Sequence, residues 1–548
     1  MTEADVVDIA RRIHTRDVSL WAAAPEAQSI VGKRLGWLDA PDWLNENREE
    51  LATWARDIRG QGFARVVVLG MGGSSLAARA LAGVFGKTEQ GLPLVVLDTT
   101  HPAAVTAAAV CLPETLFVSA SKSGTTTEVT ALTAYFYQQV KAERGRAAGE
   151  NFVAITDAGS ALQRYAEAHD FRRCFLNPAD VGGRFSVLTA FGMVPAALLG
   201  LDLDRMFNSA RTARAASGAD TPDADPSALR LGQAMARSAL AGRNKLTLLL
   251  SPQLGAFSVW VEQLVAESIG KSGIGIIPVI DESLPIGAYG MDRFFVAVTL
   301  TGDHTLDETL QALEAAGHEI DHHQLDDRYD LAGEFFRWEF AVAVAGALLA
   351  VNPFDEPDVV SSKQTTRRLL EGKKEEQANS IGEIRDDAGL TLRMPISLVD
   401  EDAGLSGQLL RFFQNAGPTN YLTLMPFLYM TDDVQNALSE LITALRAVLP
   451  LPVILNPGPR YLHSTGQLHK GGSNTGLYLI ITASTDTMLA IPGEPYSFSD
   501  LNNAQASGDF LSLAALDRQV AHLDLGSSPQ QALAAVTAEV QLRWTESV

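Results

Sequence analysis

Short, continuously apolar runs that alternate with helical stretches restrict the fold of this chain more than any other feature. Four such runs occur in the first part of the sequence: Arg65–Leu69, Leu94–Leu97, Leu116–Ala120 and Phe152–Ile155. Strands buried on both faces have this continuous pattern, and the helices between them provide the crossovers of a parallel sheet. The pattern predicts a doubly wound parallel α/β domain.

The same pattern recurs twice further along the chain. Strands are expected at Lys245–Leu250, Ile276–Val279 and Phe294–Leu300, with helices at Ala256–Ile269 and Glu334–Val351. Later strands are expected at Tyr421–Phe427, Val453–Leu455, Leu477–Thr482 and Val520–Leu523, with helices at Asp432–Val448 and Leu501–Ala515. We predict α/β architecture with a second doubly wound parallel-sheet domain, then a C-terminal α+β region in which the element order favours a split β-α-β sandwich.

Two segments without a strong period mark the expected domain boundaries. Ala215–Ala228 is rich in small and acidic residues and predicts a linker, and the charged stretch Glu371–Asp387 predicts a solvated boundary. We therefore expect an N-terminal helical lead and first sheet domain at 1–214, a second sheet domain at 229–370 and an extension at 390–548.

Composition excludes several classes of protein. The longest apolar run, Phe340–Val351, is too short to span a bilayer, and the first residues lack the apolar core of a signal peptide. Cys111 and Cys174 stand far apart in no metal-ligand spacing, which favours a reducing compartment, the cytoplasm, and argues against bound metal. A net charge of −22 disfavours nucleic acid and anionic membrane as partners, but permits a small phosphorylated ligand held in a local pocket.

Two strand-to-helix loops have the chemistry of a phosphate site. Gly70–Ser75 (GMGGSS) allows close backbone approach beside a helix N-terminus, although a tight turn with capping serines explains it equally well. Ser121–Glu128 (SKSGTTTE) carries five hydroxyl side chains, whereas one helix cap needs only one. Ligands bind at the carboxyl ends of parallel strands, so the two loops are expected to converge.

The motif SxSGxT after a strand resembles the sugar isomerase (SIS) domain, and two SIS-like blocks narrow the choice. Val181–Val187 (VGGRFSV) is similar to the signature of the glucose-6-phosphate isomerase family. The segment from His463 to Gly472 (HSTGQLHKGG) resembles the C-terminal extension of bacterial fusions of transaldolase with glucose-6-phosphate isomerase. The resemblance implies that residues of the two loops and of the VGGRFSV segment bind the substrate, namely Gly73, Ser74, Ser121, Lys122, Ser123, Thr126 and Gly183.

The same resemblance implies the proton-transfer groups. Glu267 stands in an E-S-x-G-K context like that of the family's catalytic glutamate, and partial burial would raise its pKa. Arg184 follows two glycines and is the expected stabiliser of an enediolate. Lys363 lies at the family's distance from the NPFD motif and would assist ring opening, although Glu356 occupies a position where the family usually has glutamine.

The histidine that the family places about twenty residues beyond the glutamate has no counterpart, since His304 is the first histidine after Glu267. We hypothesise that His463 or His469, in a predicted loop, replaces it; a structural or interface role for that loop is the alternative. His101 precedes a proline at a predicted turn and is expected to be structural.

The expected activity is interconversion of glucose 6-phosphate and fructose 6-phosphate through a cis-enediol, with no cofactor and no metal. A noncatalytic sugar-phosphate sensor and a dual glucose/mannose-phosphate isomerase are the alternatives. The chain is expected to be a homodimer or a monomer.

Overall fold

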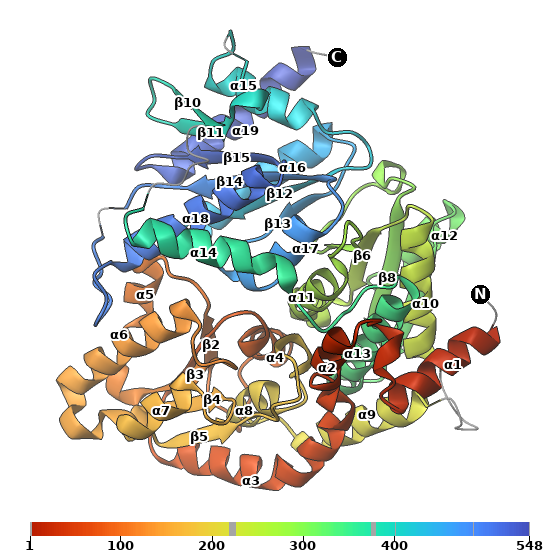
Figure 1. Cartoon of the computed structure of the whole chain (residues 1–548), viewed down its shortest axis with the longest axis vertical. Coiled ribbons are helices and arrows are strands. Elements are labelled where there is room, and N and C mark those ends of the chain that lie inside the picture. The colour runs from red at the N-terminus through yellow and green to blue at the C-terminus, as the bar shows by residue number, and fades with distance from the viewer. Residues whose placement is uncertain (1–2, 219–225, 374–379, 401, 486, 547–548) are drawn as a thin grey trace. The chain divides into compact units, whose positions relative to one another are not determined.

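The computed structural model describes residues 3–218, 226–373, 380–400, 402–485 and 487–546 (Figure 1). Residues 219–225 of the predicted linker and 374–379 of the predicted charged boundary therefore lie outside the described residues. The chain forms two compact units. The first contains Met1–Asp98, Ala109–Asp281 and Met291–Glu356, and the second contains Thr99–Ala108, Glu282–Gly290 and Pro357–Val548.

The first unit contains a parallel sheet with the strand order β2-β1-β3-β4-β5. Its strands are β1 (Arg65–Gly70), β2 (Leu94–Leu97), β3 (Thr115–Ala120), β4 (Phe152–Thr156) and β5 (Arg173–Leu176). In β1, Val66 pairs with Leu94 on one side and with Leu116 on the other. After β1 the chain continues to β2 on one side of the sheet, and after β3 it continues to β4 on the other side. The strand order therefore reverses between β1 and β3.

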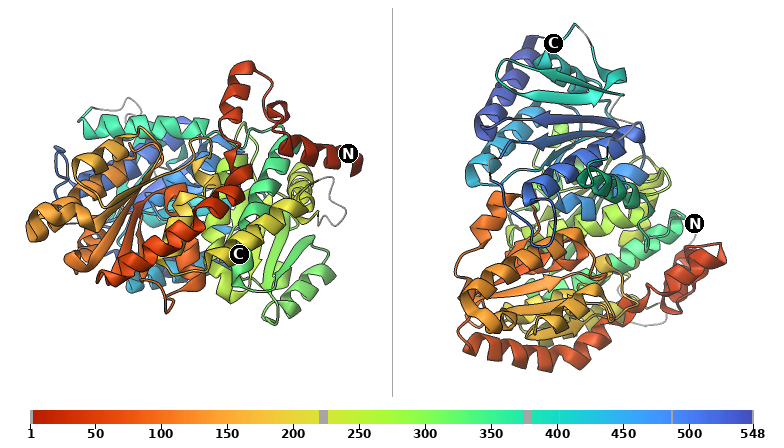
Figure 2. Two further views of the ribbon diagram at one scale, coloured as in Figure 1. Left: turned by 90° about the horizontal axis from the view of Figure 1, so that it is seen from below. Right: turned by 60° about the vertical axis from the view of Figure 1, so that its left-hand side comes forward.

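Helices cover both faces of this sheet, which Figure 2 shows from two sides. On one face, Val66 and Val68 belong to the main hydrophobic core with Leu81 of α4. On the other, Phe117 stacks on Phe136 of α6 with ring centroids 4.7 Å apart. The helices of this half are α1 (Glu3–His14), α2 (Pro25–Gly32), α3 (Ala40–Gly60), α4 (Leu76–Phe85), α6 (Thr127–Arg144), α7 (Ala161–Ala168), α8 (Ala190–Leu198) and α9 (Leu203–Ala216).

A second parallel sheet in the same unit has the order β7-β6-β8-β9. Its strands are β6 (Lys245–Leu250), β7 (Ile277–Val279), β8 (Arg293–Leu300) and β9 (Ile320–Leu325), and its helices are α10 (Ser227–Leu240), α11 (Ser258–Ile269), α12 (Asp307–Ala315) and α13 (Leu331–Leu348). Helix α13 is buried on nearly all sides, as its all-round apolar sequence requires. Both sheets share one core.

The second unit is built on a mixed sheet with the order β10-β11-β15-β14-β12-β13. Its strands are β10 (Ile381–Arg385), β11 (Thr391–Pro395), β12 (Tyr421–Pro426), β13 (Val453–Leu455), β14 (Gly476–Thr482) and β15 (Gln519–Asp524). Its helices are α5 (Pro102–Ala108), α14 (Val360–Leu370), α15 (Leu405–Gln414), α16 (Asp432–Val448), α17 (Gly466–Gly471), α18 (Phe498–Ala515) and α19 (Pro529–Glu546).

The split β-α-β topology expected for this region is wrong. Strands β13, β12, β14 and β15 are mutually parallel, whereas β11 pairs in antiparallel fashion with both β15 and β10. The alternation of apolar strands with helices α16 and α18 is the parallel pattern already seen in the other two sheets. None of the described helices is long and apolar enough to cross a membrane.

The α/β class with two doubly wound sheets is confirmed. The first sheet lies within 1–214 and the second within 229–370, whereas the third begins at Ile381, before the predicted start at 390. The domain boundaries stay a prediction.

Candidate active site

The loops that follow β1 and β3 lie side by side at the point where the strand order of the first sheet reverses. After β1 the chain makes a short 3-10 turn, Gly72–Ser74, before α4 begins. A Cβ atom on Gly73 would lie 2.2 Å from the carbonyl oxygen of Gly183. Glycine is therefore required here because the first loop packs directly on the VGGR segment, and this contact brings two predicted substrate-binding residues together.

Hydroxyl groups organise the loop after β3. The buried Ser121 Oγ lies 3.0 Å from Thr126 Oγ1 and accepts the backbone N–H of Gly124 at 3.1 Å. Gly124 has φ +70°, a conformation that suits glycine. In the described part of the chain, the N-cap Thr126 makes no side-chain cap to α6. Capping by Thr126 therefore does not explain the hydroxyl-rich sequence, which lies at a helix N-terminus that favours an anion.

Lys122 connects this loop to its surroundings. Its Nζ forms an ion pair with Asp157 and donates to the carbonyl oxygen of Ala179 at 3.3 Å. Burial raises the pKa of Asp157, although Lys122 opposes that shift. Ser123 is exposed and its Oγ lies 3.0 Å from Thr125 Oγ1, while Ser74 is half-buried.

Arg184 is buried in the centre of the site, with 5% of its side chain exposed. Its Nε donates to Ser268 Oγ at 2.9 Å. Its Nη2 donates to the carbonyl oxygens of Pro353 at 2.6 Å and Asp355 at 2.8 Å. Its Nη1 donates to Glu356 Oε2 at 3.1 Å and lies 3.4 Å from Glu267 Oε1. Two carboxylates thus share one guanidinium nitrogen.

Glu267, near the end of α11, is the carboxylate that the sequence nominates as the base. Its side chain is 13% exposed, and its Oε2 accepts Gln263 Nε2 at 2.9 Å. Burial raises its pKa, Arg184 opposes the shift and Glu356 adds to it. Burial alone would also raise the pKa of Glu356, but Arg184, together with Arg34 and Lys271, outweighs that effect and holds the pKa of Glu356 below its usual value. One carboxylate is therefore poised to hold a proton and the other to stay ionised.

The turn that carries Glu356 is fixed by a lysine that sequence reasoning missed. Lys271 Nζ donates to the carbonyl oxygen of Asn352 at 2.7 Å and to Asp355 Oδ1 at 2.8 Å. Burial, with a smaller contribution from the nearby Arg184, lowers the pKa of Lys271 to about 8, and Asp355 opposes the shift. The signal was present, because Ser268 and Lys271 are the S and K of the E-S-x-G-K motif itself.

A second missed residue is Arg34, which lies between α2 and the 3-10 turn Gly36–Asp39. Its charge lowers the pKa of both Asp157 and Glu356, which places it electrostatically beside both ends of the site. Its Cδ lies 4.0 Å from where a Cβ on Gly182 would stand. No motif marks this arginine in the sequence.

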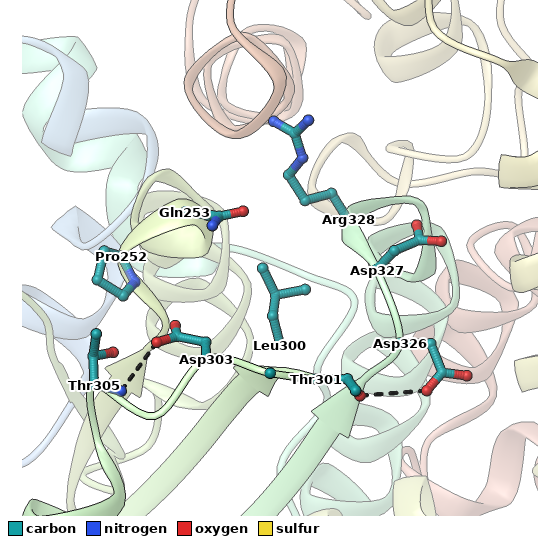
Figure 3. Close-up of a pocket in the computed structure, with 10 residues that line it drawn as sticks. Pro252, Gln253, Leu300, Thr301, Asp303, Thr305, Asp326, Asp327 and Arg328 are labelled. Atoms are coloured by element: carbon teal, nitrogen blue, oxygen red, sulfur yellow. Dashed lines mark hydrogen bonds between the residues drawn. The ribbon is translucent and has the colours of Figure 1, made fainter.

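The equivalent edge of the second sheet has different chemistry. A cavity of about 410 Å³ lies at the carboxyl ends of β6, β8 and β9, and Figure 3 shows Asp303, Asp326 and Asp327 around it. Its arginine, Arg328, donates to the carbonyl oxygen of Val84 at 3.1 Å. Three aspartates repel a phosphate, so this edge of the second sheet does not suit a phosphorylated ligand.

The remaining predicted catalytic residues belong to the second unit, and their part in the site stays a prediction. Lys363 is exposed on α14, and His463 is half-buried at the end of the 3-10 turn Arg460–His463. The segment expected to be a loop instead contains helix α17, in which His469 is 1% exposed. The neighbouring Lys470 forms a buried ion pair with Asp509 at 2.6 Å, which gives this lysine a structural role.

Comparisons with known proteins agree on one family. The profile of the phosphoglucose isomerase family matches residues 48–276. A glucose-6-phosphate isomerase of Symbiobacterium thermophilum is 32% identical over 391 residues, which cover 61% of this chain and 86% of the relative. One from Clostridioides difficile is 30% identical over 392 residues, with the same coverage.

Solved structures agree in fold. A hypothetical protein from Thermus thermophilus has a TM-score of 0.57 at 25% identity and covers 67% of this chain and 95% of its own. A glucose-6-phosphate isomerase from Chlamydia trachomatis has a TM-score of 0.51 at 20% identity and covers 68% of this chain and 79% of its own.

We predict that Gly73→Ala destabilises the first unit and Gly183→Ala does not. A Cβ on Gly73 meets backbone 2.2 Å away, whereas one on Gly183 meets nothing within 4 Å, and neither residue has a positive φ. The first change should cost about 1–3 kcal/mol of unfolding free energy and the second less than about 1 kcal/mol. Thermal denaturation of the two purified variants measures the difference, and equal midpoints would contradict the contact.

Proposed function

Because the chain belongs to the glucose-6-phosphate isomerase family, we propose that the residues around Arg184 form the site where it interconverts glucose 6-phosphate and fructose 6-phosphate. The protein is an aldose–ketose isomerase, and the reaction moves one proton between adjacent carbons. The observation that carries the proposal is the pairing of a buried base candidate, Glu267, with a guanidinium 3.4 Å away.

Glu267 is proposed to take the proton from C2 of the open-chain aldose and to return it to C1. Its raised pKa brings its proton affinity closer to neutral pH, which suits a group that must accept and then release a proton. Arg184 is proposed to stabilise the charge of the enediolate. A guanidinium stays protonated throughout, so it adds positive charge without competing for the moving proton.

The phosphate is proposed to bind in the two loops of the first sheet. Ser121, Ser123 and Thr126 offer hydroxyls beside the uncapped N-terminus of α6, and Lys122 adds a charge. Ser74 offers a further hydroxyl: its Oγ has no hydrogen-bond partner among the residues that the structure describes. We assign Arg34 to the same phosphate, because its charge acts on groups at both ends of the site.

Lys363 is proposed to assist ring opening, and its side chain is exposed to solvent. Of the two histidines we favour His463, which is half-buried. Burial lowers the pKa of His469 well below its usual value, and a ring with 1% exposure is poorly placed to meet substrate.

Cys111 and Cys174 are both free thiols, which supports a cytoplasmic location.

Replacing the base should abolish turnover. Glu267→Gln keeps the side chain's shape and removes its ability to accept a proton, so kcat should fall by about 10²–10⁴. A coupled assay of glucose 6-phosphate formation from fructose 6-phosphate measures this. The control is Glu308→Gln, an exposed glutamate of α12. Retention of a tenth or more of the parent activity by Glu267→Gln would exclude it as the base.

Neutralising the second carboxylate should shift the pH profile. Glu356 raises the pKa of Glu267, so Glu356→Gln lowers that pKa and leaves the base ionised at more acidic pH. The acid limb of the kcat/KM profile should therefore move to lower pH, while Glu308→Gln leaves it in place. An unchanged limb, or one at higher pH, would show that the two carboxylates do not interact.

Removing Arg34 should weaken substrate binding more than turnover. Arg34→Gln should raise KM for fructose 6-phosphate about tenfold or more, the equivalent of one charge-assisted hydrogen bond, with kcat within about threefold. Lys33→Gln removes the exposed neighbouring charge and is the matched control. Equal KM values in the two variants would remove Arg34 from the phosphate site.

A further inference from the structure

The second unit has a cavity at the position that parallel sheets use for ligands. It has a volume of about 420 Å³ and lies beyond the carboxyl ends of β12, β14 and β15. Strand β12 leads to β13 on one side, while β14 leads to β15 on the other, so the order reverses between β12 and β14. This is the topological position that the phosphate loops occupy in the first sheet.

His101 supplies a hydrogen-bond donor to this cavity. The residue lines the cavity and is 7% exposed. Its Nδ1 accepts the backbone N–H of Ala103 at 3.3 Å, so the proton of the neutral ring lies on Nε2. Burial lowers the pKa of His101 to about 4 and keeps the ring neutral. Within the described residues Nε2 has no protein partner, so this donor is open to a ligand or to water in the cavity.

An aromatic surface and several uncommitted polar side chains complete the lining. The ring of Tyr429 stacks on His101 with centroids 6.0 Å apart and an interplanar angle of 22°, and 36% of Tyr429 is exposed. Ser484, Ser528 and Gln530 also line the cavity, and their side chains have no protein partner in the part of the chain that the structure describes. Donors, acceptors and an exposed ring face therefore converge.

The charge of the lining excludes an anion. Among the described lining residues there is no lysine or arginine, whereas Asp433 contributes a carboxylate. The N-terminus of α16 is already capped by Thr431 and carries Asp432 and Asp433 in its first turn, so it does not attract a phosphate.

We propose that this cavity binds an uncharged sugar ring, with one face of the ring on Tyr429 and its hydroxyls on His101 Nε2 and the neighbouring serine and glutamine side chains. A pyranose combines an apolar face with an edge of hydroxyls, and the cavity offers matching partners for both. None of the residues that line this cavity belongs to the group around Arg184.

The test uses D-glucose as the probe and the full chain as the receptor. Saturation-transfer NMR is recorded with the catalytic pocket filled by excess fructose 6-phosphate, so that glucose reports only on other sites. We expect saturable binding with a dissociation constant of about 1–10 mM, typical of one small ring. Absence of saturable binding would overturn the proposal, because water alone would then satisfy His101.

Variants separate this site from nonspecific contact. Tyr429→Ala and His101→Phe should each weaken glucose binding about tenfold, while kcat/KM for fructose 6-phosphate stays unchanged. Tyr496→Ala, at another partly exposed tyrosine of the same unit, is the control and should bind like the parent. Equal binding by all three variants would overturn the proposal. So would displacement of glucose by inorganic phosphate, which would indicate an anion site.

Discussion

The buried guanidinium of Arg184 is the interaction on which the first unit depends. A charge removed from water is tolerated only when acceptors surround it, and here they are a serine hydroxyl, two backbone carbonyls and two carboxylates. Arg184 follows the first sheet, Ser268 and Glu267 belong to a helix of the second, and the carbonyls come from the turn after α13. A lysine has no planar fork to reach these directions at once, so a single arginine side chain joins elements of both sheets.

Each of the three sheets has a point where its strand order reverses. At the carboxyl ends of the strands there, the three sheets present different side chains. The first has glycines, hydroxyls and a helix end without a side-chain cap, the second has three aspartates, and the third has neutral hydroxyls around an aromatic ring. The backbone fixes where a ligand can bind, because strand ends diverge there. The residues of the loops decide the charge of the site, so similar sheets can bind ligands of different charge.

Much of the fold follows from the sequence because the apolar runs are continuous and bounded. Strands β2, β6 and β13 and helix α16 begin and end at the predicted residues. Strand β9 was missed because its sequence, IDHHQL, is polar: it is an edge strand whose His323 bonds the buried Glu334. In the site, Glu267 and Arg184 were predicted from motifs. The Glu356 contact was not, since it joins residues 172 positions apart and depends on tertiary packing.

The second unit takes in residues 99–108 from the early part of the chain, and this has a consequence for biosynthesis. Thr100 Oγ1 donates to Asn502 Oδ1 and Gln505 Oε1, whose positions are 402 and 405 residues later. At ribosomal rates of ~5–20 residues per second, that interval lasts roughly 20–80 s. During translation, residues 99–108 are made together with the strands of the first sheet, but Asn502 and Gln505 are made only after this interval. Chaperones that recognise short, partly apolar stretches would find residues 99–108 accessible for that whole period.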